Sequence, residues 1–204
     1  MLVDHQTIAA LQGRLLTELA APGDWWDGAS RRAIMEEARV AAAGLAARGP
    51  LPAAAVEVIH RVVNDSGQLT RAWADDQIDA LGDGPYAEIV GVTAIVTALD
   101  VFARAIGDHP LDLLAPVDGS PAAERPDGVG DVGAWIAMTE EKALANVSRA
   151  LSLVPRTNAT WRALVTESYS RGPQMLELTW ERALTRPQIE LVAAQISKLQ
   201  ECFY

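Results

Sequence analysis

The chain has 204 residues, and its 17 Lys and Arg against 27 Asp and Glu give a formal net charge of −10 at pH 7. This acidic balance argues against nucleic acid or an anionic membrane surface as a partner, because both need clustered Lys and Arg. Half of the residues are hydrophobic and 22% are charged, which is typical of a globular protein. The sequence has one cysteine, Cys202, which excludes a disulfide framework or a multi-cysteine zinc site within it and fits a reducing compartment.

Apolar residues recur at intervals of three and four along most of the chain, and this period predicts an all-α fold. Breaks that contain proline and glycine, such as Pro22-Gly23 and Gly49-Pro50, separate the helical stretches of the N-terminal half. Helices are expected there at 6–20, 27–46, 52–63, 68–81 and 86–106.

Residues 107–133 contain repeated prolines and glycines without a helical period, which indicates an irregular linker. Helical patterns resume at 135–153, 158–170 and 174–184. A last helix begins at Thr185, where Gln188 completes a capping box. We therefore predict an N-terminal helical lobe at 1–107, a linker at 108–134 and a C-terminal lobe at 135–204.

The first residues lack the basic and apolar regions of a secretory signal, so none is expected. The longest uncharged apolar run, 89–99, is shorter than the ~20 residues of a membrane-spanning helix. The sequence predicts a soluble, cytoplasmic protein.

The segment from Pro187 to Tyr204 resembles the core of the carboxymuconolactone decarboxylase / alkylhydroperoxidase-D-like family. Members of that family carry a glutamate twelve residues before the first cysteine of a Cys-x-x-Cys pair, and a histidine four residues after the second. Glu190 and Cys202 are separated by the same twelve residues. Three further segments are similar to parts of the two-lobed, peroxidase-related members: 25–29, 86–104 and 146–155.

The resemblance implies a fold of two pseudo-repeated lobes and a peroxidase chemistry in which Glu190 accepts a proton and Cys202 is one member of a redox pair. The second cysteine would be residue 205 and the histidine residue 209, whereas the sequence stops at Tyr204. One interpretation is a UGA codon at 205 that encodes selenocysteine. A nonsense mutation, an incomplete gene or a shortened recombinant chain are the alternatives.

An internal repeat is consistent with this plan. Glu57 precedes Leu69 by twelve residues, and Ala72 and Asp76 occupy the places of the second cysteine and the histidine. The first lobe therefore resembles a degenerate copy of the second, without thiols.

Taken singly, the site residues have simpler explanations. Cys202 lies beside Glu201, which disfavours a reactive thiolate, and Glu190 suits the first turn of any helix. Glu57 and His60 have the Glu-x-x-His spacing of di-iron bundles, but no second pair accompanies them in the sequence. No metal or cofactor is expected.

Two functions therefore stay open. The first is a thiol or selenol peroxidase that acts on a small hydroperoxide, with a thiol protein as its reductant. The second is a non-catalytic helical assembly protein of the same fold, and decarboxylase or isomerase chemistry on a small lactone is a weaker third. The resemblance implies a homo-oligomer, and the stripe of the last helix is expected to be exposed.

Overall fold

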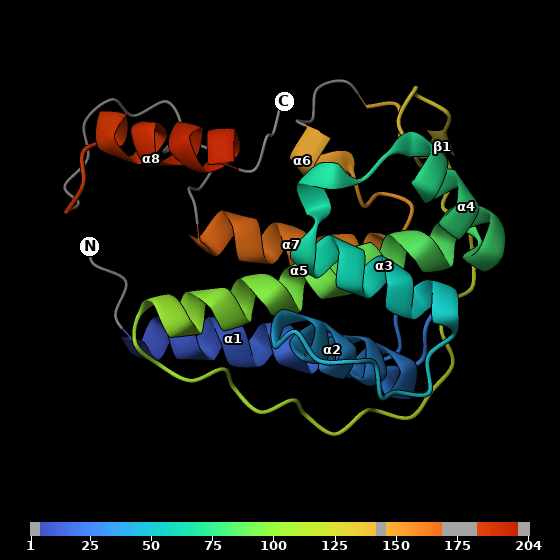
Figure 1. The fold of residues 1–204 in the computed structure, drawn as a ribbon, viewed down its shortest axis with the longest axis horizontal. Helices are drawn as coiled ribbons and strands as arrows, with labels where there is room; N and C mark the ends of the chain where they lie inside the picture. The colour runs from blue at the N-terminus through green and yellow to red at the C-terminus, as the bar shows by residue number, and fades with distance from the viewer. Residues whose placement is uncertain (1–4, 142–145, 169–182, 200–204) are drawn as a thin grey trace.

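The computed structural model describes residues 5–141, 146–168 and 183–199. The described residues confirm the all-α fold (Figure 1), with one two-stranded antiparallel sheet and a short 3-10 helix, η1 (Ser66–Gln68). The α-helices are α1 (His5–Ala20), α2 (Gly28–Ala42), α3 (Ala53–Asn64), α4 (Arg71–Leu81), α5 (Asp83–Ala105), α6 (Asn146–Arg149), α7 (Pro155–Ser168) and α8 (Arg186–Leu199). The strands are β1 (Val129–Gly130) and β2 (Met138–Thr139), paired with Val129 opposite Thr139.

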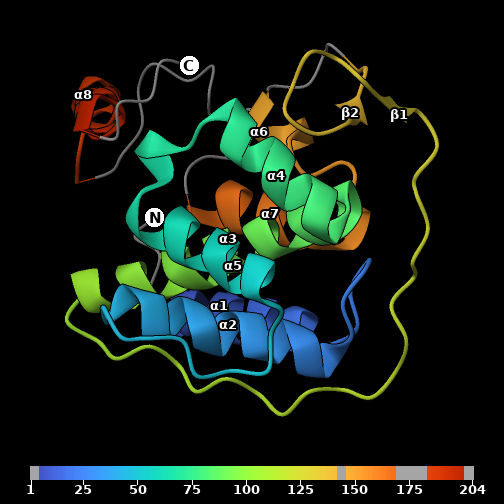
Figure 2. The same ribbon diagram turned by 45° about the vertical axis from the view of Figure 1, so that its right-hand side comes forward.

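Helix α5 is the centre of the core, and α2, α3, α4 and α7 pack around it (Figure 2). It is mostly apolar, and Ile89, Val92 and Ile95 are fully buried. A helix of this composition needs partners on more than one face. By length and composition α5 is also the one described helix that passes the criteria for a membrane span, with 67% of its most apolar window buried inside the protein. An apolar helix at the centre of a protein core passes the same criteria and is buried in the same way.

Helix ends differ from the predictions where a capping residue fixes them. Helix α4 begins at residue 71 because the Thr70 side chain accepts a hydrogen bond from the Trp73 backbone N–H at 3.3 Å. Helix α2 stops at Ala42 rather than at 46, and Gly44 follows with a left-handed φ of 67°. A glycine in this conformation is a common helix stop.

The predicted helix at 135–153 is wrong over most of its described residues, which form β2 and turns and are helical only in α6. The chain folds back on itself there, since Thr139 N–H donates to the Ser152 hydroxyl at 2.8 Å. The apolar residues at 151, 153 and 154 form a small cluster with Ala87 of α5. The spacing of these apolar residues therefore reflects their contact with Ala87 and not a helical period. Most of the predicted helix at 174–184 lies outside the described residues.

Residues 108–126, here called the strap, are irregular and run along the α1–α2 side of the bundle (Figures 1 and 2). The Arg32 guanidinium donates to the carbonyls of Leu113 at 3.1 Å and Leu114 at 2.7 Å. Val117 N–H donates to the carbonyl of Ala20 at 2.8 Å. These bonds hold the strap against the helices of the N-terminal half.

Helix α7 comes after the strap, the two strands and α6 in the chain. It packs against both α1 and α5. Its Leu164 belongs to the same core cluster as the buried residues of α1, α2, α3 and α5. Residues 155–168 therefore share a core with the N-terminal helices. The division into two lobes stays a prediction.

Helix α8 begins with the predicted capping box, because Thr185 N–H donates to the Gln188 side-chain oxygen at 2.8 Å. None of its described residues is buried. Leu191 and Leu199 are each 70% exposed, and Val192 and Ile196 are more than half exposed. This confirms the expected exposure of the apolar stripe.

Asp27 is the N-cap of α2, and it provides a test of helix capping with a defined pH dependence. Its carboxylate accepts the Ser30 backbone N–H at 2.7 Å, and this hydrogen bond lowers the pKa of Asp27 below its ordinary value of 3.8. Asp27→Ala is expected to lower the free energy of unfolding by about 1 kcal/mol at pH 7. A lowered pKa means that this stability is complete above pH 3.8 and is lost as the pH falls through the folded-state pKa.

Urea unfolding of both proteins between pH 2 and pH 7 measures the difference. Asp27→Asn keeps an acceptor for Ser30, so it should cost less than the alanine variant and show no such pH dependence. An equal cost for Asp27→Ala at pH 2 and pH 7 would contradict the assignment.

Candidate functional sites

Of the predicted redox pair, Glu190 lies in the second turn of α8 and Cys202 falls outside the described residues. The Glu190 side chain is 51% exposed, and its Oε1 lies 3.6 Å from Nε of Arg186 one turn earlier. The described structure thus gives the position of the glutamate on its helix. The contact between the two predicted site residues stays a prediction.

The degenerate copy, by contrast, is described in full as α3, η1 and α4. Glu57 is the fifth residue of α3, and Trp73 is the third residue of α4. Trp73 Nε1 donates to Glu57 Oε1 at 3.4 Å. The glutamate side chain therefore extends to the first turn of the following helix, where Ala72 occupies the place of the second cysteine.

Leu69 and Asp76 complete this arrangement. Leu69 is extended and directly precedes the N-cap Thr70, and Asp76 lies one helical turn after Ala72. Residues four apart share a helix face, so the counterparts of the second cysteine and the histidine lie on one side of α4.

A buried charged cluster around Glu88, which sequence reasoning missed, joins α5 to the loop at 22–27. Glu88 is 0% exposed, and its carboxylate accepts the backbone N–H groups of Trp25, Trp26 and Asp24. Nε of Arg31 on α2, itself 2% exposed, lies 3.3 Å from the same carboxylate. Two of the segments that carry the family resemblance, 25–29 and 86–104, therefore meet at Glu88.

Asp24 extends this cluster to α7. Its carboxylate accepts the backbone N–H groups of Arg156 at 3.1 Å and Thr157 at 3.2 Å, in the first turn of the helix. The Thr157 hydroxyl donates to Glu88 Oε1 at 3.5 Å. The first backbone N–H groups of a helix have no acceptor within the helix, and Asp24 provides one for two of them in α7. This fixes the start of α7 against the loop.

Electrostatics within the cluster work in opposite directions. Burial raises the pKa of Glu88, while the Arg31 guanidinium and the Trp25 backbone N–H act to lower it. Burial likewise lowers the pKa of Arg31, and the Glu88 carboxylate opposes that effect. The ion pair thus offsets part of the cost of placing two charges in the core, and burial is the larger effect on both pKa values.

There is no room for a substrate at this cluster. A Cβ added to Gly23 would lie 1.7 Å from Glu88 Oε1, and one added to Gly84 would lie 2.3 Å from the Trp25 ring. The backbone approaches these side chains so closely that only glycine fits. The cluster is therefore a structural joint between the loop, α2, α5 and α7.

A second buried carboxylate explains His60. His60 Nε2 lies 2.6 Å from Oε1 of Glu37 on α2, a residue that is 2% exposed. The pair joins α3 to α2, and within the described ranges no three His, Cys, Asp or Glu side chains are placed to hold a metal ion. The Glu-x-x-His spacing of Glu57 and His60 is therefore not part of a metal site among those residues.

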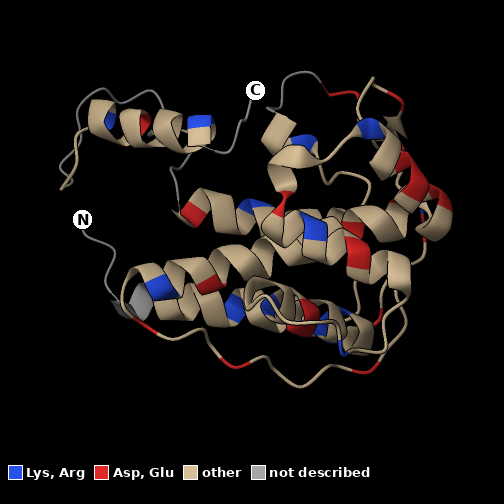
Figure 3. Ribbon diagram, viewed as in Figure 1, with Lys and Arg blue, Asp and Glu red and all other residues tan. Residues whose placement is uncertain are grey.

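Charged residues are distributed over the helices (Figure 3), and the acidic residues of α4 are Asp75, Asp76 and Asp79.

Comparisons with protein-family models, with curated proteins and with solved structures give no match to the chain.

Proposed function

We propose that the protein belongs to the carboxymuconolactone decarboxylase / alkylhydroperoxidase-D-like family and is a thiol or selenol peroxidase. In this proposal it reduces small hydroperoxides in the cytoplasm. Glu190 accepts the proton, and Cys202 forms the redox pair with a cysteine or selenocysteine at position 205. The observation that carries the proposal is the contact of Glu57 with the first turn of α4 in the degenerate copy.

In the proposed repeat, the C-terminal copy has the same geometry as the degenerate copy. Glu57 and Glu190 are both the fifth residue of their helices, and each precedes the site position by twelve residues. If the C-terminal copy folds in the same way, Cys202 directly precedes the next helix and residue 205 lies in its first turn. The N-terminus of a helix stabilises a thiolate or selenolate, and Glu190 would be the adjacent proton acceptor.

The chemistry balances with a thiol reductant alone. One member of the pair gives its proton to Glu190 and attacks the hydroperoxide, so that an S–O or Se–O bond forms, the O–O bond breaks and the alcohol leaves with a proton. The oxidised member condenses with its neighbour to a disulfide or selenenylsulfide and releases water. A protein dithiol then reduces that bond and is itself oxidised.

The exposed face of α8 favours the alternative function, a non-catalytic helical assembly protein. Leu191, Val192, Ile196 and Leu199 are all more than half exposed, and a contiguous apolar face of this kind requires a partner. A homo-oligomer built on this face would need no thiol chemistry. The two functions differ in their dependence on Cys202.

The test is peroxide consumption by the natural reading frame extended past Tyr204, with position 205 read as cysteine or selenocysteine. We expect turnover with a dithiol reductant, loss of turnover in Cys202→Ser, and a decrease of about 100-fold or more in Glu190→Gln. Glu57→Gln, the same change in the degenerate copy, is the matched control and should keep full activity. The 204-residue chain has one thiol, so we expect no sustained turnover from it.

Three results would contradict the proposal. The first is a codon after Tyr204 that encodes neither cysteine nor selenocysteine. The second is turnover that Cys202→Ser leaves unchanged. The third is an extended chain with no turnover, which would favour the assembly function.

A further inference from the structure

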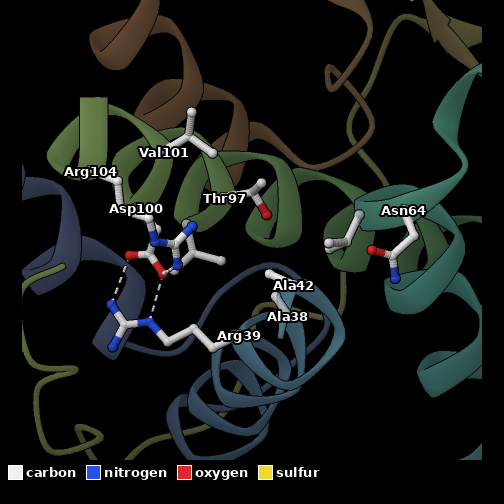
Figure 4. A pocket seen from close by; sticks show the side chains of 10 residues that line it. Ala38, Arg39, Ala42, Asn64, Thr97, Asp100, Val101 and Arg104 are labelled. Carbon is white, nitrogen blue, oxygen red and sulfur yellow. Dashed lines mark hydrogen bonds and ion pairs between the residues drawn. The ribbon is translucent and has the colours of Figure 1, made fainter. Parts of the chain in front are cut away.

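A groove of about 240 Å³ lies between α2, α3 and α5. Its floor is apolar and includes Ala38, Val63 and Val96, of which Ala38 and Val96 are buried. Ala38 and Ala42 are one turn apart on α2, and these small side chains leave the space that larger residues would fill. Figure 4 shows the groove with α5 on one side and α2 on the other.

One end of the groove is charged. Arg39 donates through Nε and Nη2 to both oxygens of Asp100, each at 2.8 Å, and Nη2 also donates to the Leu111 carbonyl of the strap at 2.8 Å. Figure 4 shows this pair at one end and Asn64 at the other, with Thr97 between them. Asp100 is thus held by a bidentate arginine whose own position is fixed.

Arg104 supplies a second cation at the same end. Its Nη2 lies 3.9 Å from Asp100, which is too long for a hydrogen bond, and its side chain is 52% exposed. Because Arg39 already neutralises Asp100, Arg104 leaves a surplus of one positive charge beside an apolar floor. This surplus is local, in a chain whose net charge is −10.

We propose that this groove binds a small amphiphilic carboxylate, with the carboxylate on Arg104 and the apolar body over Ala38, Ala42 and Val96. A volume of about 240 Å³ is smaller than the pockets that hold drug-sized ligands, so a short-chain carboxylate such as octanoate has a suitable size. Because the surplus at this end is one positive charge, a monoanion is preferred over a dianionic phosphate ester. The guanidinium geometry matches a carboxylate through two parallel N–H donors.

The test is titration of the folded chain with sodium octanoate, followed by amide chemical shifts in NMR spectra. We expect saturable shifts around residues 38–42 and 96–104. Arg104→Gln should weaken binding about 10-fold or more, since it removes a charged hydrogen-bond donor. Ala42→Phe should weaken it as well, because Ala42 is exposed and a larger ring would fill the groove without entering the core.

Arg71→Gln is the matched control, since it removes one exposed arginine from α4 at a distance from the groove and should leave the affinity unchanged. Octanol, with a similar tail and no charge, should bind at least 10-fold more weakly than octanoate. The proposal is overturned by equal affinity for octanol, by unchanged affinity in Arg104→Gln, or by shifts confined to α8 that persist in Ala42→Phe. Each variant is first checked for a wild-type amide spectrum away from the substituted site.

Discussion

Glu88→Ala is expected to lower the free energy of unfolding by about 3–5 kcal/mol at pH 7, the usual cost of removing one partner of a buried ion pair. The substitution leaves Arg31, which is 2% exposed, in the core without its counter-charge. It also removes the acceptor for the backbone N–H groups of Trp25 and Trp26. Buried donors without acceptors carry their full desolvation cost.

Urea unfolding followed by tryptophan fluorescence and by circular dichroism measures this effect. Glu36→Ala is the matched control, because Glu36 is 54% exposed and forms a 2.8 Å surface pair with Arg32. That pair is expected to contribute less than about 1 kcal/mol. Adding Arg31→Met to Glu88→Ala should recover part of the loss, since it removes the unpaired charge. A loss no larger than that of Glu36→Ala would show that the cluster contributes little.

Leu153→Ala is expected to cost about 2–5 kcal/mol, which is the range for truncation of a fully buried leucine. Leu153 is 0% exposed and packs with Ala87, Leu151 and Val154 in the cluster where the 146–155 segment contacts α5. Ala87 is held on α5 and Val154 directly precedes α7, so we expect the cavity to close only in part. Most of the cost therefore persists after relaxation.

The same substitution at an exposed leucine after α2, Leu45→Ala, is the control. Leu45 is 46% exposed, so the change should alter the free energy of unfolding by no more than about 0.5 kcal/mol. We also expect Leu153→Ala to shift the whole unfolding transition, because α7 contributes Leu164 to the main core. Equal effects of the two leucine substitutions, or a separate transition in Leu153→Ala, would contradict this packing.

The helices that could be predicted from sequence are those whose apolar period matches their burial. Helices α1, α3 and α5 agree with the predicted ranges within a few residues, because each packs a continuous apolar face. The helix predicted at 135–153 is wrong over most of its described residues, because the apolar side chains at 151 and 153 reach the core from turns. Spacing alone does not distinguish these two cases.

Less of the candidate sites than of the fold could be predicted from the sequence. The choice of Glu190 as a site residue rests on its spacing to Cys202 and stays a prediction, whereas the capping box at Thr185 correctly gave the start of α8. The role of Glu88 did not follow from the sequence, because its partners are backbone N–H groups more than 60 residues away. Such groups have no sequence signature. The groove between α2, α3 and α5 was missed for the same reason, since it depends on how three helices pack.

The capping of α7 by Asp24 sets an order on folding during synthesis. Asp24 and the Arg156 backbone N–H that it accepts are separated by 132 residues, so the acceptor leaves the ribosome long before its donor. The N-terminal helices and the Glu88–Arg31 pair can form early, whereas the contacts to α7 form only after Thr157 has emerged. Until then the Asp24 carboxylate lacks the two backbone N–H donors that it has in the folded protein.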